Sequence, residues 1–164
     1  MDSIRSWLID MDGVLVREEH PIPGADLFLQ RLRERDASFL VLTNNSIYTP
    51  RDLAARLRRN SLDVPEEAIW TSALATANLL ESQRPGGSAY VIGEAGLTTA
   101  LHQVGYTLTD SDPDYVVLGE TRTYSFVPMR SASSSAVPAS SRPTPTQRGP
   151  RRTDRCPPPA RLRR

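Results

Sequence analysis

The sequence contains no lysine, and all 20 of its basic residues are arginine. It has a single cysteine, Cys156, so no disulfide can form within the chain. No apolar run reaches the roughly 18 residues that a membrane span requires, and we find no signal peptide. These absences lead us to expect a cytoplasmic chain that meets no membrane.

Acidic residues are scarce at the C-terminal end. Residues 127–164 contain nine arginines and one acid, a formal charge of +8, whereas residues 1–126 contain 11 arginines and 18 acids, a formal charge of −7. Eight of the 14 prolines also lie in the last 38 residues, which have no apolar periodicity. We expect this tail to be disordered, because it has too little apolar surface to offset the entropy of ordering. The abrupt change in composition suggests a frameshift near codon 126.

The first 126 residues alternate short apolar runs with helical patterns. This alternation predicts an α/β fold with a parallel sheet covered on both faces. Trp7 and Trp70 lie beside apolar runs and are expected in the core, and Arg56 is expected on a solvated helix face with its neighbouring arginines. The predicted strands are 4–9, 38–45, 89–93 and 114–119, and the predicted helices are 25–35, 72–80, 94–104 and one that begins at Thr49-Pro50.

Polar side chains follow the first two predicted strands. Asp10 and Asp12 come after the first strand and are separated by one residue, so they can point to the same side of an extended chain. Thr43, Asn44 and Asn45 end the second strand. Because sites in open parallel sheets form at the carboxyl ends of the strands, we expect all five side chains in one crevice. Two carboxylates, a hydroxyl and amides suit phosphoryl transfer, with a divalent cation offsetting the negative charge.

Simpler interpretations exist for each motif. An Asp-x-Asp at the end of a strand often only caps a turn, and Thr-Asn-Asn is commonly a polar loop. A calcium-binding EF-hand is a poor match, because counting from Asp10 puts Val14 at a ligand position and Pro21 where the bidentate glutamate belongs. The occurrence of both motifs at neighbouring strand ends favours the catalytic interpretation.

The quoted motifs, with others that follow, resemble the haloacid dehalogenase (HAD) superfamily. The resemblance covers about residues 4–126 and is closest to the NagD-like branch, which includes nitrophenyl- and pyridoxal-phosphatase-like proteins. The matching segments are "DMDGVL", "PIPGA", "LTNN", "TSALATANLL", "VIGEAGL" and "DPDYVVLGETRTYSF".

The resemblance implies a Mg²⁺-dependent phosphomonoester hydrolase acting on a small phosphorylated metabolite or nucleotide. Asp10 would be the nucleophile that forms an aspartyl-phosphate, and Asp12 the general acid and base. Both would also bind Mg²⁺, Asp12 through its backbone carbonyl. Thr43 and Asn44, with Asn45 beside them, would bind the substrate phosphoryl group. The resemblance also implies a homodimer formed through the cap.

The family pattern divides the chain into three parts. Residues 1–70 would be the N-terminal part of a doubly wound, Rossmann-like HAD core, 71–126 part of an inserted α/β cap, and 127–164 the tail. A later lysine and a later acidic motif complete the site in this family, but the chain has no lysine and only Asp154 as an acid after Glu120. We therefore expect impaired activity. The alternative is a non-catalytic fragment whose basic tail binds nucleic acid or anionic surfaces without sequence specificity.

Overall fold

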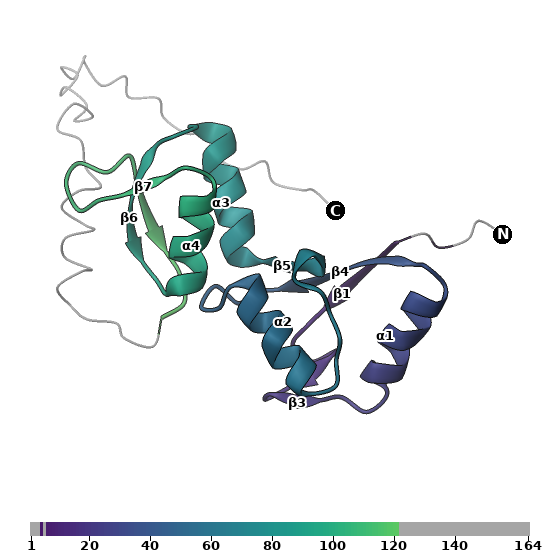
Figure 1. Ribbon diagram of the computed structural model, residues 1–164. Helices are drawn as coiled ribbons and strands as arrows, with labels where there is room; N and C mark the ends of the chain where they lie inside the picture. Colours follow the sequence, from purple (N-terminus) through teal and green to yellow (C-terminus); the bar gives the residue numbers. More distant parts are fainter. Residues whose placement is uncertain (1–3, 5, 122–164) are drawn as a thin grey trace, which may run out of the picture.

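The computed structural model describes residue 4 and residues 6–121, and within them it confirms the α/β fold (Figure 1). The predicted tail and residues 122–126 lie outside the described residues. No described helix has both the length and the apolar character needed to cross a membrane. The elements are β1 (Ser6–Asp10), β2 (Val16–Arg17), β3 (His20–Pro21), α1 (Ala25–Glu34), β4 (Ser38–Thr43), α2 (Pro50–Arg59), a 3-10 turn (Glu66–Ala68), β5 (Ile69–Thr71), α3 (Ser72–Gln83), β6 (Ser88–Ile92), α4 (Ala95–Gln103), β7 (Thr107–Leu108) and β8 (Tyr115–Leu118).

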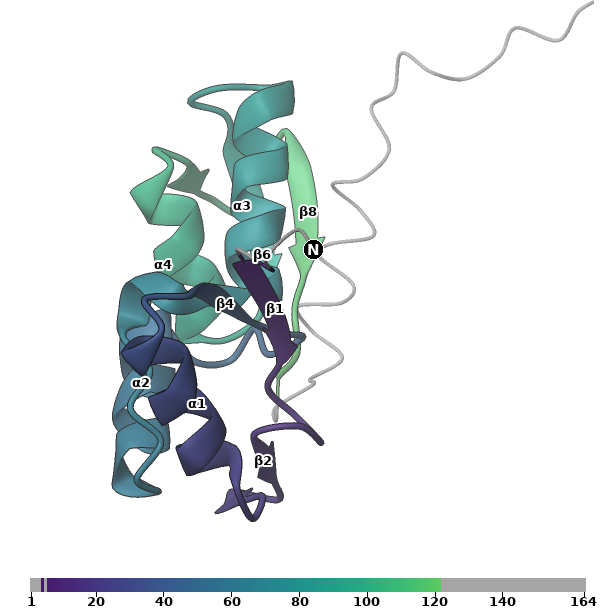
Figure 2. The same cartoon turned by 90° about the vertical axis from the view of Figure 1, so that its right-hand side faces the viewer.

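The first sheet contains three parallel strands in the order β1-β4-β5. Alternate residues of each strand point to one face, where Ile9, Val41 and Ile69 are buried. Leucines of α1 and α2 belong to the same buried cluster, so both helices cover this face. Figure 2 shows both helices to one side of β1 and β4.

The opposite face of the first sheet is not covered by the described residues, so the expected two-sided covering is wrong for this part of the chain. Leu8 is 73 % exposed and Trp70 is 39 % exposed. The prediction that Trp70 lies in the core is therefore wrong, because the residue alternates to the open face of β5. Trp7 is partly buried as expected and packs edge-to-face against Phe28, with ring centroids 5.6 Å apart.

The start of α2 follows its sequence signal. Thr49 accepts a hydrogen bond from the Asp52 backbone N–H, and the Asp52 carboxylate accepts one from the Thr49 N–H, which forms a capping box. Pro50 occupies the first turn, where its missing N–H has no intrahelical partner to lose. Leu53 and Leu57 then point into the first core.

A second parallel sheet has the order β7-β6-β8 and a separate core. α3 and α4 contribute mainly alanines and leucines to this core. The hydroxyl of buried Tyr106 lies 2.8 Å from the Leu80 carbonyl oxygen and 2.7 Å from that of Arg84, and it donates its proton to these acceptors. Burial raises the pKa of Tyr106, and the neighbouring Tyr115 and Asp114 raise it further.

The two sheets meet at the loop before α2. The Gly96 N–H, at the start of α4, donates to the Ile47 carbonyl at 2.8 Å, and the Glu120 N–H donates to the Ser46 hydroxyl at 2.9 Å. A Cβ on Gly96 would lie 2.6 Å from the Tyr48 carbonyl oxygen, far inside normal contact. This position therefore requires glycine for the close approach of α4 to the loop.

Candidate functional site

Asp10 and Asp12 lie at the carboxyl end of β1, as the sequence predicts. The Met11 N–H still donates to the Leu42 carbonyl, so β1 remains paired with β4 up to the site. Gly13 then turns the chain with φ of +86°, a conformation that favours glycine, and its N–H donates to the Val16 carbonyl at 2.7 Å. The strand thus ends in a tight turn that leaves both carboxylates exposed.

Thr43 joins the ends of the two strands. Its hydroxyl donates to the Asp12 carboxylate at 3.1 Å and accepts a hydrogen bond from the Asn45 backbone N–H, also at 3.1 Å. Thr43 is buried, so the hydroxyl has a fixed orientation toward the acid. The Asp12 side chain is therefore held by a residue 31 positions further along the chain.

The two asparagines shape the loop that follows β4. The Asn44 backbone carbonyl accepts a hydrogen bond from the Ser72 hydroxyl at 2.7 Å. The Asn45 side-chain oxygen accepts from the backbone N–H groups of Ile47 and Tyr48, at 3.1 and 2.9 Å. The Asn45 oxygen is thus engaged in an Asx turn that leads the chain toward α2.

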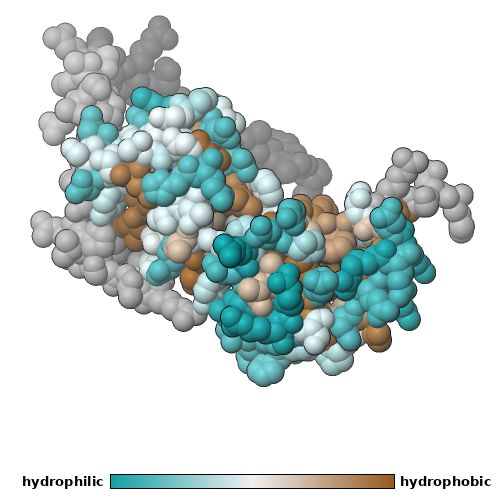
Figure 3. All heavy atoms as spheres, in the orientation of Figure 1, coloured by the Kyte–Doolittle hydropathy of each residue, from teal (hydrophilic) through white to brown (hydrophobic). Residues whose placement is uncertain are grey.

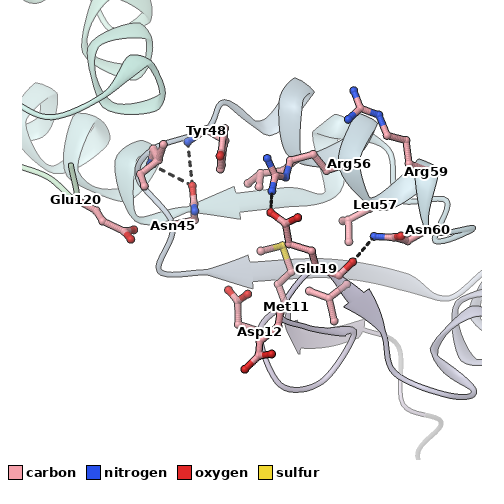
Figure 4. Close-up of a pocket in the computed structure, with 14 residues that line it drawn as sticks. Met11, Asp12, Glu19, Asn45, Tyr48, Arg56, Leu57, Arg59, Asn60 and Glu120 are labelled. Atoms are coloured by element: carbon pink, nitrogen blue, oxygen red, sulfur yellow. Dashed lines mark hydrogen bonds and ion pairs between the residues drawn. The ribbon is translucent and has the colours of Figure 1, made fainter. Parts of the chain in front are cut away.

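A cavity of about 490 Å³ opens beside Asp12 (Figure 4). It lies between the β2–β3 hairpin, α2 and the loop after β4, and Glu120 approaches it from the second sheet. Asp10 is not among its lining residues. The cavity is lined by Met11, Asp12, Val16, Glu18, Glu19, Asn45, Ile47, Tyr48, Leu53, Arg56, Leu57, Arg59, Asn60 and Glu120.

Arg56, which lines the cavity, makes contacts that the sequence did not reveal. Arg56 forms an ion pair with Glu19, and its guanidinium lies 4.3 Å from the centre of the Tyr48 ring. The Asn60 side-chain amide donates to the Glu19 backbone carbonyl at 2.8 Å. Arg56 is therefore paired and partly buried, with 34 % of its side chain exposed, whereas the neighbouring Arg58 and Arg59 are exposed as expected. The spacing of four between Arg56 and Asn60 predicts a shared helix side, but their partner on the hairpin cannot be read from sequence.

The two strand-end aspartates supply oxygen atoms of the kind that Mg²⁺ prefers. Mg²⁺ is commonly held by one or two carboxylates together with waters and substrate phosphate oxygens. Asp10 and Asp12 fit this donor set. No larger group of three or more His, Cys, Asp or Glu side chains suited to a metal ion occurs within residues 6–121.

Known proteins share this sequence and fold. The family model for the haloacid dehalogenase-like hydrolase matches residues 7–107. Dihydroxyacetone phosphatase from Corynebacterium glutamicum is 64 % identical over 121 residues, which is 74 % of this chain and 44 % of that protein. The ribonucleotide monophosphatase NagD from Escherichia coli is 40 % identical over 130 residues, which is 79 % of this chain and 52 % of that protein.

The fold agrees with these matches. The solved structure of NagD from E. coli K-12 superimposes with a TM-score of 0.76 at 38 % identity, and the match covers 81 % of this chain and 53 % of that one. The chain spans about half the length of the curated relatives it matches. On this sequence and structural similarity, the chain belongs to the haloacid dehalogenase-like hydrolase family, in the branch that includes NagD.

Proposed function

We propose that this chain provides the nucleophile and the proton-transfer group of a phosphomonoester phosphatase. The observation that supports the proposal most directly is the hydrogen bond from Thr43 to Asp12, which connects the ends of two parallel strands beside an open cavity. A polar crevice at the carboxyl ends of parallel strands is where α/β enzymes bind their ligands.

The chemistry divides between the two aspartates. The Asp10 carboxylate attacks phosphorus, the bond to the alcohol oxygen breaks, and an aspartyl-phosphate forms. Asp12 donates a proton to the departing alcohol and later accepts one from the water that releases inorganic phosphate. Thr43 holds Asp12 and, with the loop at Asn44 and Asn45, borders the space that the phosphoryl group would occupy.

Asp10 and the Asp12 backbone carbonyl would hold Mg²⁺, which stabilises negative charge on the phosphoryl oxygens when it is bound. The two carboxylates lie close together in the chain, so a bound cation would also offset part of their negative charge. We therefore expect activity to require Mg²⁺.

The cavity beside Asp12 favours a substrate whose leaving group is a small neutral alcohol. Its lining includes four carboxylates but only two guanidinium groups, and one of these, Arg56, is already paired with Glu19. A second anionic group on the substrate would meet net negative charge. Relatives named dihydroxyacetone phosphatase and ribonucleotide monophosphatase support a small phosphorylated metabolite or nucleotide as the substrate class.

We further propose that the chain alone has low activity. The family pattern includes a later lysine and a later acidic motif, and this sequence has neither. The loss of one positioned charge-stabilising group typically costs about 10²–10³ in rate. The division into core and cap at residue 70, the cytoplasmic location and the homodimer remain predictions.

The test is phosphate release from dihydroxyacetone phosphate and p-nitrophenyl phosphate by the purified chain, with Mg²⁺ or with EDTA. We expect slow, Mg²⁺-dependent turnover that Asp10→Asn abolishes, with the C. glutamicum enzyme measured alongside as a reference. Asp36→Asn, an exposed acid outside the site, is the matched control. Turnover that survives Asp10→Asn would exclude Asp10 as the nucleophile.

A further inference from the structure

The tip of the β2–β3 hairpin has a strained backbone. Glu18 and Glu19 connect the two strands and have φ values of +48° and +71°, in the left-handed region that favours glycine. Positive φ at both central residues is typical of a type I′ turn, in which Asn-Gly is a preferred pair. Two glutamates disfavour this turn, so contacts with another part of the molecule have to hold it.

The contacts that hold the tip come from the end of α2. The Glu19 carboxylate forms the ion pair with Arg56, and the Glu19 backbone carbonyl accepts the hydrogen bond from the Asn60 side-chain amide. The Arg56 guanidinium also lies over the Tyr48 ring. Figure 4 shows the Glu19 carboxylate reaching from the hairpin toward Arg56. We call the contacts of Glu19 with Arg56 and Asn60 the hairpin clamp.

Arg56 differs from the arginines that follow it on α2. The surface over α1 and α2 is largely hydrophilic (Figure 3), as expected for helices that face water. Arg58 and Arg59 are exposed, whereas Arg56 is partly buried beside Glu19 and Tyr48. A substitution of Arg56 therefore acts on the hairpin, and the same substitution of Arg58 does not.

The base of the hairpin is fixed independently of the hairpin clamp. The Gly13 N–H donates to the Val16 carbonyl at 2.7 Å, and the Ile22 N–H donates to the Leu15 carbonyl at 2.9 Å. Leu15 and Val16 are buried in the first core. The base therefore stays beside Asp12 when the hairpin clamp breaks, while the strained tip can move away from α2.

The hairpin and α2 form two walls of the cavity beside Asp12, so the hairpin clamp limits the distance between these walls. A leaving group that is too large for the cavity has to push the tip away from α2 and break the ion pair. We propose that Arg56 and Glu19 limit the size of the leaving group that the site accepts, with Arg56 as a positioning residue that acts through the hairpin. The hairpin clamp itself stands on the structure, whereas its effect on substrate choice rests on the proposed function.

The experiment compares Arg56→Gln with the unsubstituted 164-residue chain in two measurements. The first is the rate of hydrogen exchange at the backbone amides of residues 16–22, which form the hairpin and the residue after it. The second is the ratio of kcat/KM for uridine 5′-monophosphate to kcat/KM for dihydroxyacetone phosphate. Both substrates release a primary alcohol, and the alcohols differ mainly in size. We expect the exchange rate and the ratio to rise by about two- to fivefold, because amide exchange and the larger alcohol have to break the same partly exposed ion pair.

Arg58→Gln is the matched control. Arg58 lies on the same helix, its side chain is 65 % exposed, and it does not line the cavity. Its ion-pair partner is Asp63, at 3.9 Å, which lies outside the hairpin. We expect this variant to have the exchange rate and the substrate ratio of the unsubstituted chain.

A second variant separates the position of the hairpin from the charge of Arg56. It combines Arg56→Gln with Glu18→Asn and Glu19→Gly, a pair that adopts a type I′ turn without strain. The Asn60 amide can still donate to the backbone carbonyl at position 19. We expect the exchange rate and the substrate ratio to return toward the values of the unsubstituted chain. Slow exchange with a ratio that stays raised would mean that Arg56 selects the leaving group by direct contact, which would overturn the positioning role.

Two further results would overturn the inference. One is hydrogen exchange in the hairpin that Arg56→Gln does not accelerate. The other is accelerated exchange with an unchanged substrate ratio in a chain whose turnover requires Asp10, because the hairpin would then have no influence on substrate size. Accelerated exchange in a chain without Asp10-dependent turnover would refute the proposed function and leave the hairpin clamp intact.

Discussion

The two parallel sheets of this molecule have similar architectures but differ at the ends of their strands. In the first sheet, β1 and β4 end in Asp10 and Thr43. In the second sheet, β6 and β8 are followed by Gly93 and Gly119.

Within residues 6–121, the difference explains why the candidate site lies at the first sheet. A Cβ at Gly93 or Gly119 would lie 2.9 or 2.7 Å from the Leu97 side chain, so the second sheet uses its strand ends for close packing against α4. The first sheet uses the same topological position for polar side chains and a cavity. A parallel sheet therefore provides the crevice, and the residues after each strand determine whether it can perform chemistry.

The largest expected effect comes from removing a core side chain of the second sheet. Leu101 is fully buried, and Leu101→Ala should destabilise that sheet by about 2–5 kcal/mol through lost burial and a residual cavity. Both tryptophans of the chain, Trp7 and Trp70, belong to the first sheet. We expect hydrogen exchange in α4 to accelerate while the urea midpoint detected by tryptophan fluorescence stays unchanged.

The matching variant in the first core is Leu29→Ala, which should shift the tryptophan-detected midpoint directly, since Leu29 is also fully buried. If Leu101→Ala and Leu29→Ala both accelerate hydrogen exchange in α4 and both lower the tryptophan-detected urea midpoint to the same extent, the two cores unfold as one unit.

A smaller effect is expected where the sheets meet. Gly96→Ala places a Cβ against the Tyr48 and Ser46 carbonyl oxygens, and it should cost about 1–3 kcal/mol because backbone has to move. Ala95→Ser, at the adjacent exposed position, should leave the free energy of unfolding nearly unchanged. Urea denaturation followed by circular dichroism measures both. A tolerated Gly96→Ala would mean that α4 does not approach the loop this closely.

The smallest effect concerns acid stability of the second sheet. Hydrogen bonds from the Ser88 backbone N–H and hydroxyl, with the nearby Arg84 guanidinium, hold the pKa of Asp114 below its ordinary value of 3.8. A lowered folded-state pKa stabilises the fold above pH 3.8, and this contribution is lost as the pH falls through the lowered value.

Asp114→Asn should therefore flatten the dependence of the urea midpoint on pH below about pH 4. Asp110→Asn, at an exposed position before β8, provides the comparison. If the urea midpoint of Asp114→Asn depends on pH as that of the unsubstituted chain does, Asp114 does not contribute to acid unfolding.

The sequence predicted local structure well where the signal lies within one element. The helix start at Thr49-Pro50 and the alternation of strands and helices are both confirmed. These features depend on neighbouring residues, whose propensities and spacing are visible in the sequence. The placement of Asp12 near Thr43 followed from one general rule about parallel strands.

The features that could not be predicted from the sequence depend on contacts between segments that are distant in the chain. Glu19 and Arg56 are 37 residues apart, and nothing in either motif indicates that they pair. Glu120 lines the cavity beside Asp12, and its N–H donates to the hydroxyl of Ser46, 74 residues earlier in the chain. Trp70 was misplaced because an apolar strand pattern does not reveal which of its faces the rest of the chain covers.

The alternation along β1 sets a boundary that is useful for engineering. Leu8 and Asp10 point the same way and are about 7 Å apart along the strand. Any designed cover that shields the leucine and leaves the carboxylate open to substrate has to change from apolar to polar within that length. A cover that ends too early leaves Leu8 in water, and one that extends too far excludes water from Asp10. A library of such covers can therefore vary only the helix turn or strand end that lies over Leu8 and Asp10, and keep the rest of the covering segment constant.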